Sequence, residues 1–93
     1  MKYYKRKWLA PNIQGQDSFI SAEIETSEYG VDARIKLADC SRPIFLDFDS
    51  FPSGKRSLQQ KLRKLDTLIQ ELENFREKYI EAISEVMEST LHD

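Results

Sequence analysis

The chain has 93 residues, of which 40% are hydrophobic and 32% charged, and its formal net charge is −2. This length predicts one domain, residues 1–93, and the apolar content is too high for a disordered chain. Cys40 is the single cysteine and His92 the single histidine, which excludes an internal disulfide and a metal site built on such ligands. The net acidity argues against a general nucleic-acid binder, and we expect neither a metal nor a cofactor.

The first eight residues include four cations and no acid. A signal peptide would also require an apolar run of about 7–15 residues after them, and no such run follows. No window approaches the roughly 18 apolar residues of a membrane span. We therefore expect a cytoplasmic protein that does not contact a membrane.

Four runs with a two-residue period predict strands at about residues 3–10, 17–27, 31–40 and 43–50. The third run is the clearest, because Val31, Ile35 and Leu37 alternate with charged residues. The turns between the runs are short and contain breakers such as Gly30 and Pro43. Sequential strands joined by short turns pair antiparallel, so the pattern predicts a meander.

No glycine or proline occurs from residue 55 to residue 93, and apolar residues recur there at helical spacing. This pattern predicts one helix at about residues 57–91, roughly 50 Å long. Ser57 and Gln60 fit a capping box, in which the serine hydroxyl accepts from a backbone N–H near Gln60. The expected fold class is α+β: a four-stranded antiparallel β-meander packed by one long C-terminal α-helix.

The predicted helix is longer than the sheet that would pack against it, because about 20 helical residues already match a strand of about nine residues. Its apolar stripe also fits a heptad pattern, with Arg76 as the strong interruption. We therefore expect a homo-oligomer, with a dimer favoured. The expected interface residues are Leu72, Tyr79, Ile80, Ile83, Val86 and Met87. The alternative is that the stripe covers the chain's own sheet, or that the helix breaks near Asn74.

Charge is segregated along the helix. Residues 55–64 carry five cations and no acid, whereas eight acids and two cations follow from Asp66 onward. This order opposes the helix macrodipole. An antiparallel pair of helices would set basic starts against acidic ends. Alternatively, Lys55 and Arg56 could bind an anion together with the free N–H groups of the first turn.

The first strand mixes aromatic and basic residues, as proteins that bind single-stranded nucleic acids do. The candidate anion or nucleic-acid contacts are Tyr3, Lys5, Lys7, Lys55 and Arg56. The other interpretation is an edge strand in which Tyr4 and Trp8 pack inward, while lysines prevent edge-to-edge pairing.

No catalytic motif is present. The segment 54–57 lacks the earlier glycine of a phosphate-binding loop, because Asp49 stands at that position. Asp47 and Asp49 share a face of the fourth run, and we interpret them as a solvated polar face. The sequence predicts a non-enzymatic binding or regulatory protein that acts through protein–protein contact as a homo-oligomer, with room for a further, unidentified protein partner. The alternative is a nucleic-acid-binding accessory protein that uses the first strand and the helix start.

Overall fold

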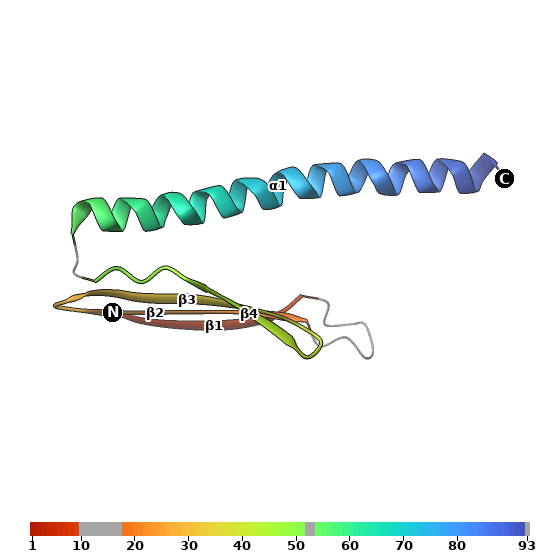
Figure 1. Cartoon of the computed structure of the whole chain (residues 1–93). Helices are drawn as coiled ribbons and strands as arrows, with labels where there is room; N and C mark the ends of the chain where they lie inside the picture. The colour runs from red at the N-terminus through yellow and green to blue at the C-terminus, as the bar shows by residue number, and fades with distance from the viewer. Residues whose placement is uncertain (10–17, 52–53, 93) are drawn as a thin grey trace. The chain divides into compact units, whose positions relative to one another are not determined.

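A computed structural model describes residues 1–9, 18–51 and 54–92, with the helical backbone alone for residues 89–92. The elements in chain order are β1 (Lys2–Trp8), β2 (Phe19–Ser27), β3 (Gly30–Asp39), β4 (Arg42–Asp47) and α1 (Lys55–His92) (Figure 1). The predicted α+β class, with one long C-terminal helix, is confirmed. The predicted ends of the first two strands at residues 10 and 17 lie outside the described residues.

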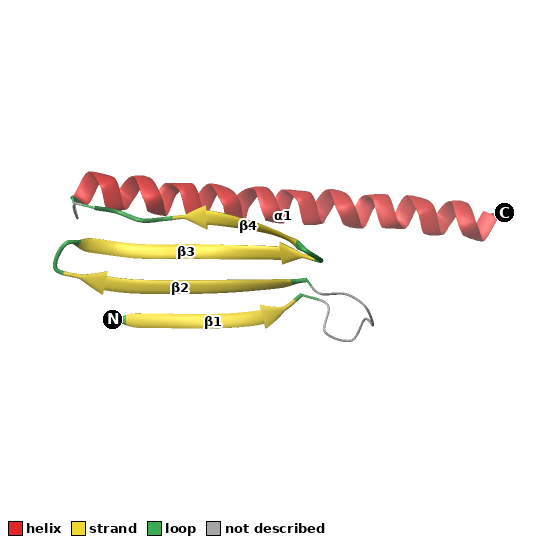
Figure 2. Cartoon of the chain, turned by 60° about the horizontal axis from the view of Figure 1, so that its bottom comes forward, coloured by secondary structure: helices red, strands yellow, loops and turns green. Residues whose placement is uncertain are grey.

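The four strands form one sheet in the order β1-β2-β3-β4, and every neighbouring pair is antiparallel (Figure 2). The predicted meander is therefore confirmed. Beyond β4, a bridge between Val31 and Ser50 extends the pairing. The N–H of Phe48 also donates to the carbonyl of Ala33 at 2.8 Å, so the segment after β4 stays beside β3.

The strand register sorts the side chains onto two faces. Ile24 stands opposite Ala33, Ala22 opposite Ile35, and Leu37 opposite both Ile20 and Ile44. Since directly opposite residues share a face, these side chains make one apolar face, as the alternation on β2 and β3 predicts. Among the described residues, the buried hydrophobic side chains are Ala38 and Phe48. The other apolar residues of the sheet are half-buried or exposed.

Gly30 begins β3 where the chain passes close to the segment after β4. Its φ is +149°, and a Cβ there would lie 2.1 Å from the carbonyl oxygen of Ser50. Val31 donates to that same oxygen at 3.1 Å, and Ser50 donates back to the Val31 carbonyl at 2.8 Å. The backbone approach therefore requires a residue without a side chain.

Helix α1 begins before the predicted capping box. Leu58 donates its N–H to the carbonyl of Gly54 at 3.0 Å, so helical bonding already starts there. The hydroxyl of Ser57 instead lies 2.7 Å from that of Ser50, a partner outside the helix. The prediction that Ser57 caps the helix is thus wrong, because its hydroxyl bonds to the segment after β4.

The helix has 38 residues, which corresponds to about 57 Å at 1.5 Å per residue. It continues without interruption through Asn74, so the alternative of a break there is wrong. The chain divides into two compact units, Met1–Leu62 and Arg63–Asp93. Packing of the helix against the sheet remains a prediction.

Candidate interaction surfaces

The second unit presents a stripe of large apolar side chains along α1. Residues three and four apart lie on the same side of a helix, so these side chains form one continuous face. We call this face the apolar stripe, and its exposed members are Ile69, Leu72, Phe75, Tyr79, Ile80, Ile83, Val86 and Met87. All six residues predicted for an oligomer interface therefore lie exposed on one helix.

Two neighbouring rings stand in the middle of the stripe. Phe75 and Tyr79 stack with their ring centroids 6.0 Å apart and their planes 18° from parallel. The two rings are 67% and 57% exposed, so their mutual contact covers only part of their surfaces. A single helix has no second layer with which to bury such a stripe, since its side chains all project outward from one axis.

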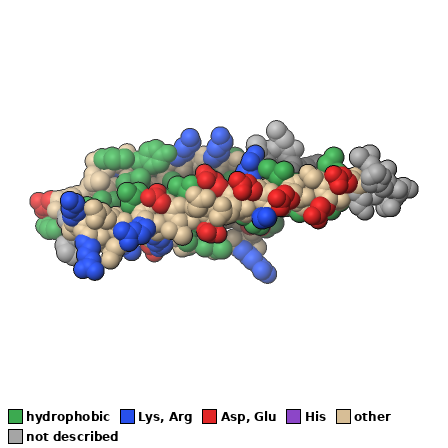
Figure 3. All heavy atoms as spheres, turned by 90° about the horizontal axis from the view of Figure 1, so that it is seen from above, with side chains coloured by type: hydrophobic (Ala, Val, Ile, Leu, Met, Phe, Trp, Pro, Cys, Tyr) green, Lys and Arg blue, Asp and Glu red, His purple; other side chains and the backbone are tan. Residues whose placement is uncertain are grey.

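The charges of α1 are divided as the sequence indicates. Figure 3 shows blue side chains at the start of the helix and red ones along its later turns. The first turn contains no acidic residue. The described contacts between charged side chains within the helix include a 3.3 Å ion pair between Lys78 and Glu81. This pair lies within the later turns, so the start of the helix remains basic and its later part remains acidic.

The side chains of β1 point to the opposite faces from those that the edge-strand interpretation predicts. The register sets Tyr3 opposite Ile24 and Lys7 opposite Ile20, on the apolar face. Tyr4 and Trp8 therefore lie on the other face, and their predicted inward packing is wrong. The physical reason is the partner of Trp8, which is Phe19 and not an aliphatic residue of the apolar face.

The candidate contacts of the nucleic-acid interpretation are thus divided. Tyr3, Lys5 and Lys7 share the apolar face of the sheet, whereas Lys55 and Arg56 are exposed at the start of α1. The structure brings the first three together on one strand face.

A cluster of cations and aromatic rings occupies the opposite face of the sheet. Arg6 lies over the rings of Phe19 at 3.9 Å and Trp8 at 5.0 Å, measured from the guanidinium carbon to each ring centroid. Lys36 lies 5.5 Å from the centroids of both Phe19 and Phe45. We call these five residues, which come from all four strands, the cation–ring cluster. They form a continuous row of alternating charge and ring across the sheet.

Cross-strand contacts hold the cluster together. Trp8 and Phe19 meet edge to face, with centroids 5.6 Å apart and planes at 74°. The register sets Ser21 between Arg6 and Lys36, so a small polar residue separates the two cations. Cation–ring and ring–ring pairs each stabilise a sheet modestly, which explains why such a face can stand exposed.

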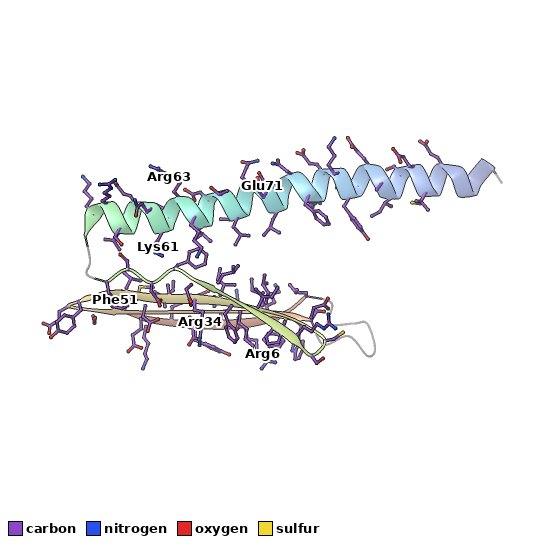
Figure 4. All side chains as sticks on the ribbon, in the orientation of Figure 1. Arg6, Arg34, Phe51, Lys61, Arg63 and Glu71 are labelled. Atoms are coloured by element: carbon purple, nitrogen blue, oxygen red, sulfur yellow. The ribbon has the colours of Figure 1, made fainter. Side chains whose placement is uncertain are left out.

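An ion pair between Arg34 and Glu23 lies next to the cluster. Arg34, which lies 4.9 Å from the ring of Phe45, donates to the carboxylate of Glu23 at 2.7 Å. The same contact raises the pKa of Arg34. Figure 4 shows Arg6 and Arg34 on the same face of the sheet. Among the residues that the structure describes, neither Arg6 nor Lys36 forms a salt bridge with a carboxylate.

Beyond Arg34, acidic residues outnumber cations. A surface hollow of about 650 Å³ is lined there by five carboxylates and two cations, which are Glu23, Glu25, Asp32, Asp47, Asp49, Lys2 and Arg34. A hydrogen bond to Asp49 and repulsion by that carboxylate raise the pKa of Asp32. Because the raised pKa favours the protonated form in the folded state, the contribution of Asp32 to stability is present in acid. It is lost as the pH rises through the raised pKa.

Asp47 and Asp49, which the sequence pairs on one strand, both line this hollow, but only Asp47 belongs to β4. β4 ends at Asp47, and the carboxylate of Asp49 accepts the N–H of Ala33 at 2.8 Å. Over the residues that the structure describes, no group of three or more histidine, cysteine or acidic side chains is arranged to hold a metal ion. Within the same residues, no helix has the length and apolar character of a membrane span.

Comparison with protein-family models, with curated proteins and with solved structures found no match to this chain.

Sequence reasoning missed the cation–ring cluster. Arg6 and Trp8 are two residues apart and share a face of any strand, which was a readable signal. Phe19, Lys36 and Phe45 belong to three other segments, and only the register of the whole sheet brings them beside this pair.

Proposed function

We propose that this chain is a small non-enzymatic binding protein that associates with a second copy of itself through the apolar stripe of α1. The exposure of that stripe is the observation that supports the proposal most strongly. Ile83 is 41% exposed and Ile80 is 45% exposed, although burial of each such side chain would contribute about 1.5–3 kcal/mol. Contiguous exposed apolar patches of this kind usually mark an interface.

The spacing of the stripe favours another helix as the occupant. Leu65, Leu72 and Tyr79 recur every seven residues, and Ile69 and Ile83 occupy the complementary heptad positions. Apolar residues at both positions are typical of helices that pack knobs into holes. The same helix on a second chain carries the same heptad pattern, so each helix can cover the stripe of the other.

The charge distribution favours a second copy over an unrelated helix. In an antiparallel pair that overlaps along the whole of α1, the basic start of one helix would lie toward the acidic end of the other, and the later part of the stripe would meet the earlier heptad residues Leu62 and Leu65. A parallel pair would set acids beside acids along the later turns, which opposes association. The antiparallel arrangement also offsets the unfavourable placement of these charges in the macrodipole of each helix.

We also propose that the protein has a regulatory role through a further protein partner. Its proposed location is the cytoplasm. The absence of a catalytic motif from the sequence supports a binding role over an enzymatic one.

Unfolding of the helix should depend on protein concentration. If folding of the later turns requires a second copy, the thermal midpoint of the helical circular-dichroism signal should rise by several degrees over about a hundredfold increase in concentration, by mass action. A midpoint that stays constant over that range would show that the helix does not depend on association.

A further inference from the structure

We propose that the cation–ring cluster of the sheet binds single-stranded nucleic acid, with its rings stacking on bases and with Arg6 and Lys36 contacting phosphates. This surface lies on β1 to β4 and does not include the apolar stripe of α1. The proposal is therefore independent of self-association.

Exposed aromatic rings lie in a row across the sheet. Trp8 is 45% exposed and Phe45 48% exposed, and they lie on the two edge strands with Phe19 between them. Every nucleobase has a flat π face, so rings in such a row can accept bases of any sequence. An unpaired strand supplies these faces, whereas a duplex keeps its bases stacked inside.

The two cations of the cluster lie beside its central ring. Arg6 and Lys36 flank the central ring of Phe19, and the described residues give neither of them a carboxylate partner. A guanidinium stacked on a ring keeps its N–H groups directed outward in its own plane, where they can donate to phosphate oxygens. Charges spaced between rings match the alternation of phosphate and base along a single strand.

Acidic residues limit the extent of the site. The ion pair between Arg34 and Glu23 closes the cluster on one side, and the acidic hollow follows beyond it. Phosphates would be repelled there, so the cluster has room for a footprint of only a few nucleotides. A short footprint with two cations predicts binding that is modest and strongly weakened by salt.

An acidic peptide is the competing occupant, since it would also be attracted to Arg6 and Lys36. It would make little use of three neighbouring rings, because carboxylates offer no flat face to stack on them. The alternation of rings with cations therefore favours the nucleic acid, and the test includes the peptide.

The experiment measures fluorescence anisotropy of a labelled oligothymidine and an oligouridine of about 12 nucleotides at low and at physiological salt. At low salt, we expect saturable binding that quenches Trp8. In the variant Arg6→Gln/Lys36→Gln, the affinity should fall at least about tenfold. The control Lys5→Gln/Lys7→Gln removes the same charge from the same sheet but from its apolar face, and its affinity should fall less than about threefold.

Two single variants guard against loss of folding. Ser21→Glu inserts a carboxylate between Arg6 and Lys36, where it can pair with both cations and so preserve the sheet, yet it should abolish binding. Phe45→Leu removes one ring without a charge, so it should weaken binding while leaving the salt dependence unchanged. Each variant is compared with the wild type by its circular-dichroism spectrum and its thermal midpoint.

Three results would overturn the proposal. The first is no binding of either oligonucleotide at low salt. The second is an equal loss of affinity in the two double variants, which would mean attraction by overall charge. The third is competition by a polyglutamate peptide that is as effective as competition by unlabelled oligonucleotide, which would identify an acidic protein as the partner.

Discussion

Replacing Ile83 by aspartate should dissociate the oligomer that we propose. Ile83 lies in the middle of the later part of the apolar stripe, so a second helix packed there would bury the new carboxylate without a partner. An unpaired charge in a desolvated contact should weaken association by at least about a hundredfold. Light scattering of the wild type and the variant at equal concentration measures the effect. The sheet should keep its fold, as reported by Trp8 fluorescence.

Asn74→Asp is the matched control for this substitution. It adds the same charge to the same helix on the side opposite Ile83, and the new carboxylate can still accept the hydrogen bond that the side-chain amide of Gln70 donates to Asn74 at 3.1 Å. The control should keep the mass of the wild type. An unchanged mass for Ile83→Asp would contradict an interface on the stripe, and equal dissociation of both variants would point to a general effect of charge.

Replacing Gly30 by alanine should destabilise the sheet strongly. The new Cβ would meet the carbonyl oxygen of Ser50 at 2.1 Å and a ring carbon of Phe51 at 2.9 Å, and the backbone φ is unfavourable for any residue with a side chain. We expect the free energy of unfolding to fall by about 2–4 kcal/mol, which corresponds to roughly 10 °C or more in the thermal midpoint. Denaturant unfolding followed by Trp8 fluorescence measures the loss.

Gly54→Ala provides the control. A Cβ at that position would meet nothing within 4 Å, so no contact opposes it. Its stability should change by less than about 1 kcal/mol in either direction. A Gly30→Ala protein as stable as Gly54→Ala would contradict the close approach of β3 and the segment after β4.

Much of the fold could be predicted because its signals are local. The alternation on β3 sets one side chain after another on opposite faces, and short turns leave antiparallel pairing as the simple solution. The helix could be predicted because no breaker interrupts its apolar period. The orientation of β1 could not, since Tyr, Lys, Arg and Trp alternate there without a contrast between apolar and polar positions.

The features that sequence reasoning missed depend on contacts between distant segments. Ser57 has the residue type and spacing of a helix cap, but its hydroxyl meets Ser50 across the connection to the helix. The cation–ring cluster needs the register of four strands before Arg6 and Lys36 are seen on either side of Phe19. No single-segment pattern contains that information.

The mass of the wild-type chain in solution tests self-association most directly. One chain has a mass of 10.9 kDa. At tens of micromolar protein, light scattering should give about twice that mass, because the apolar stripe of each helix would be covered by another. A mass equal to that of one chain at the same concentration would contradict the account, since the stripe would then have no second copy to cover it.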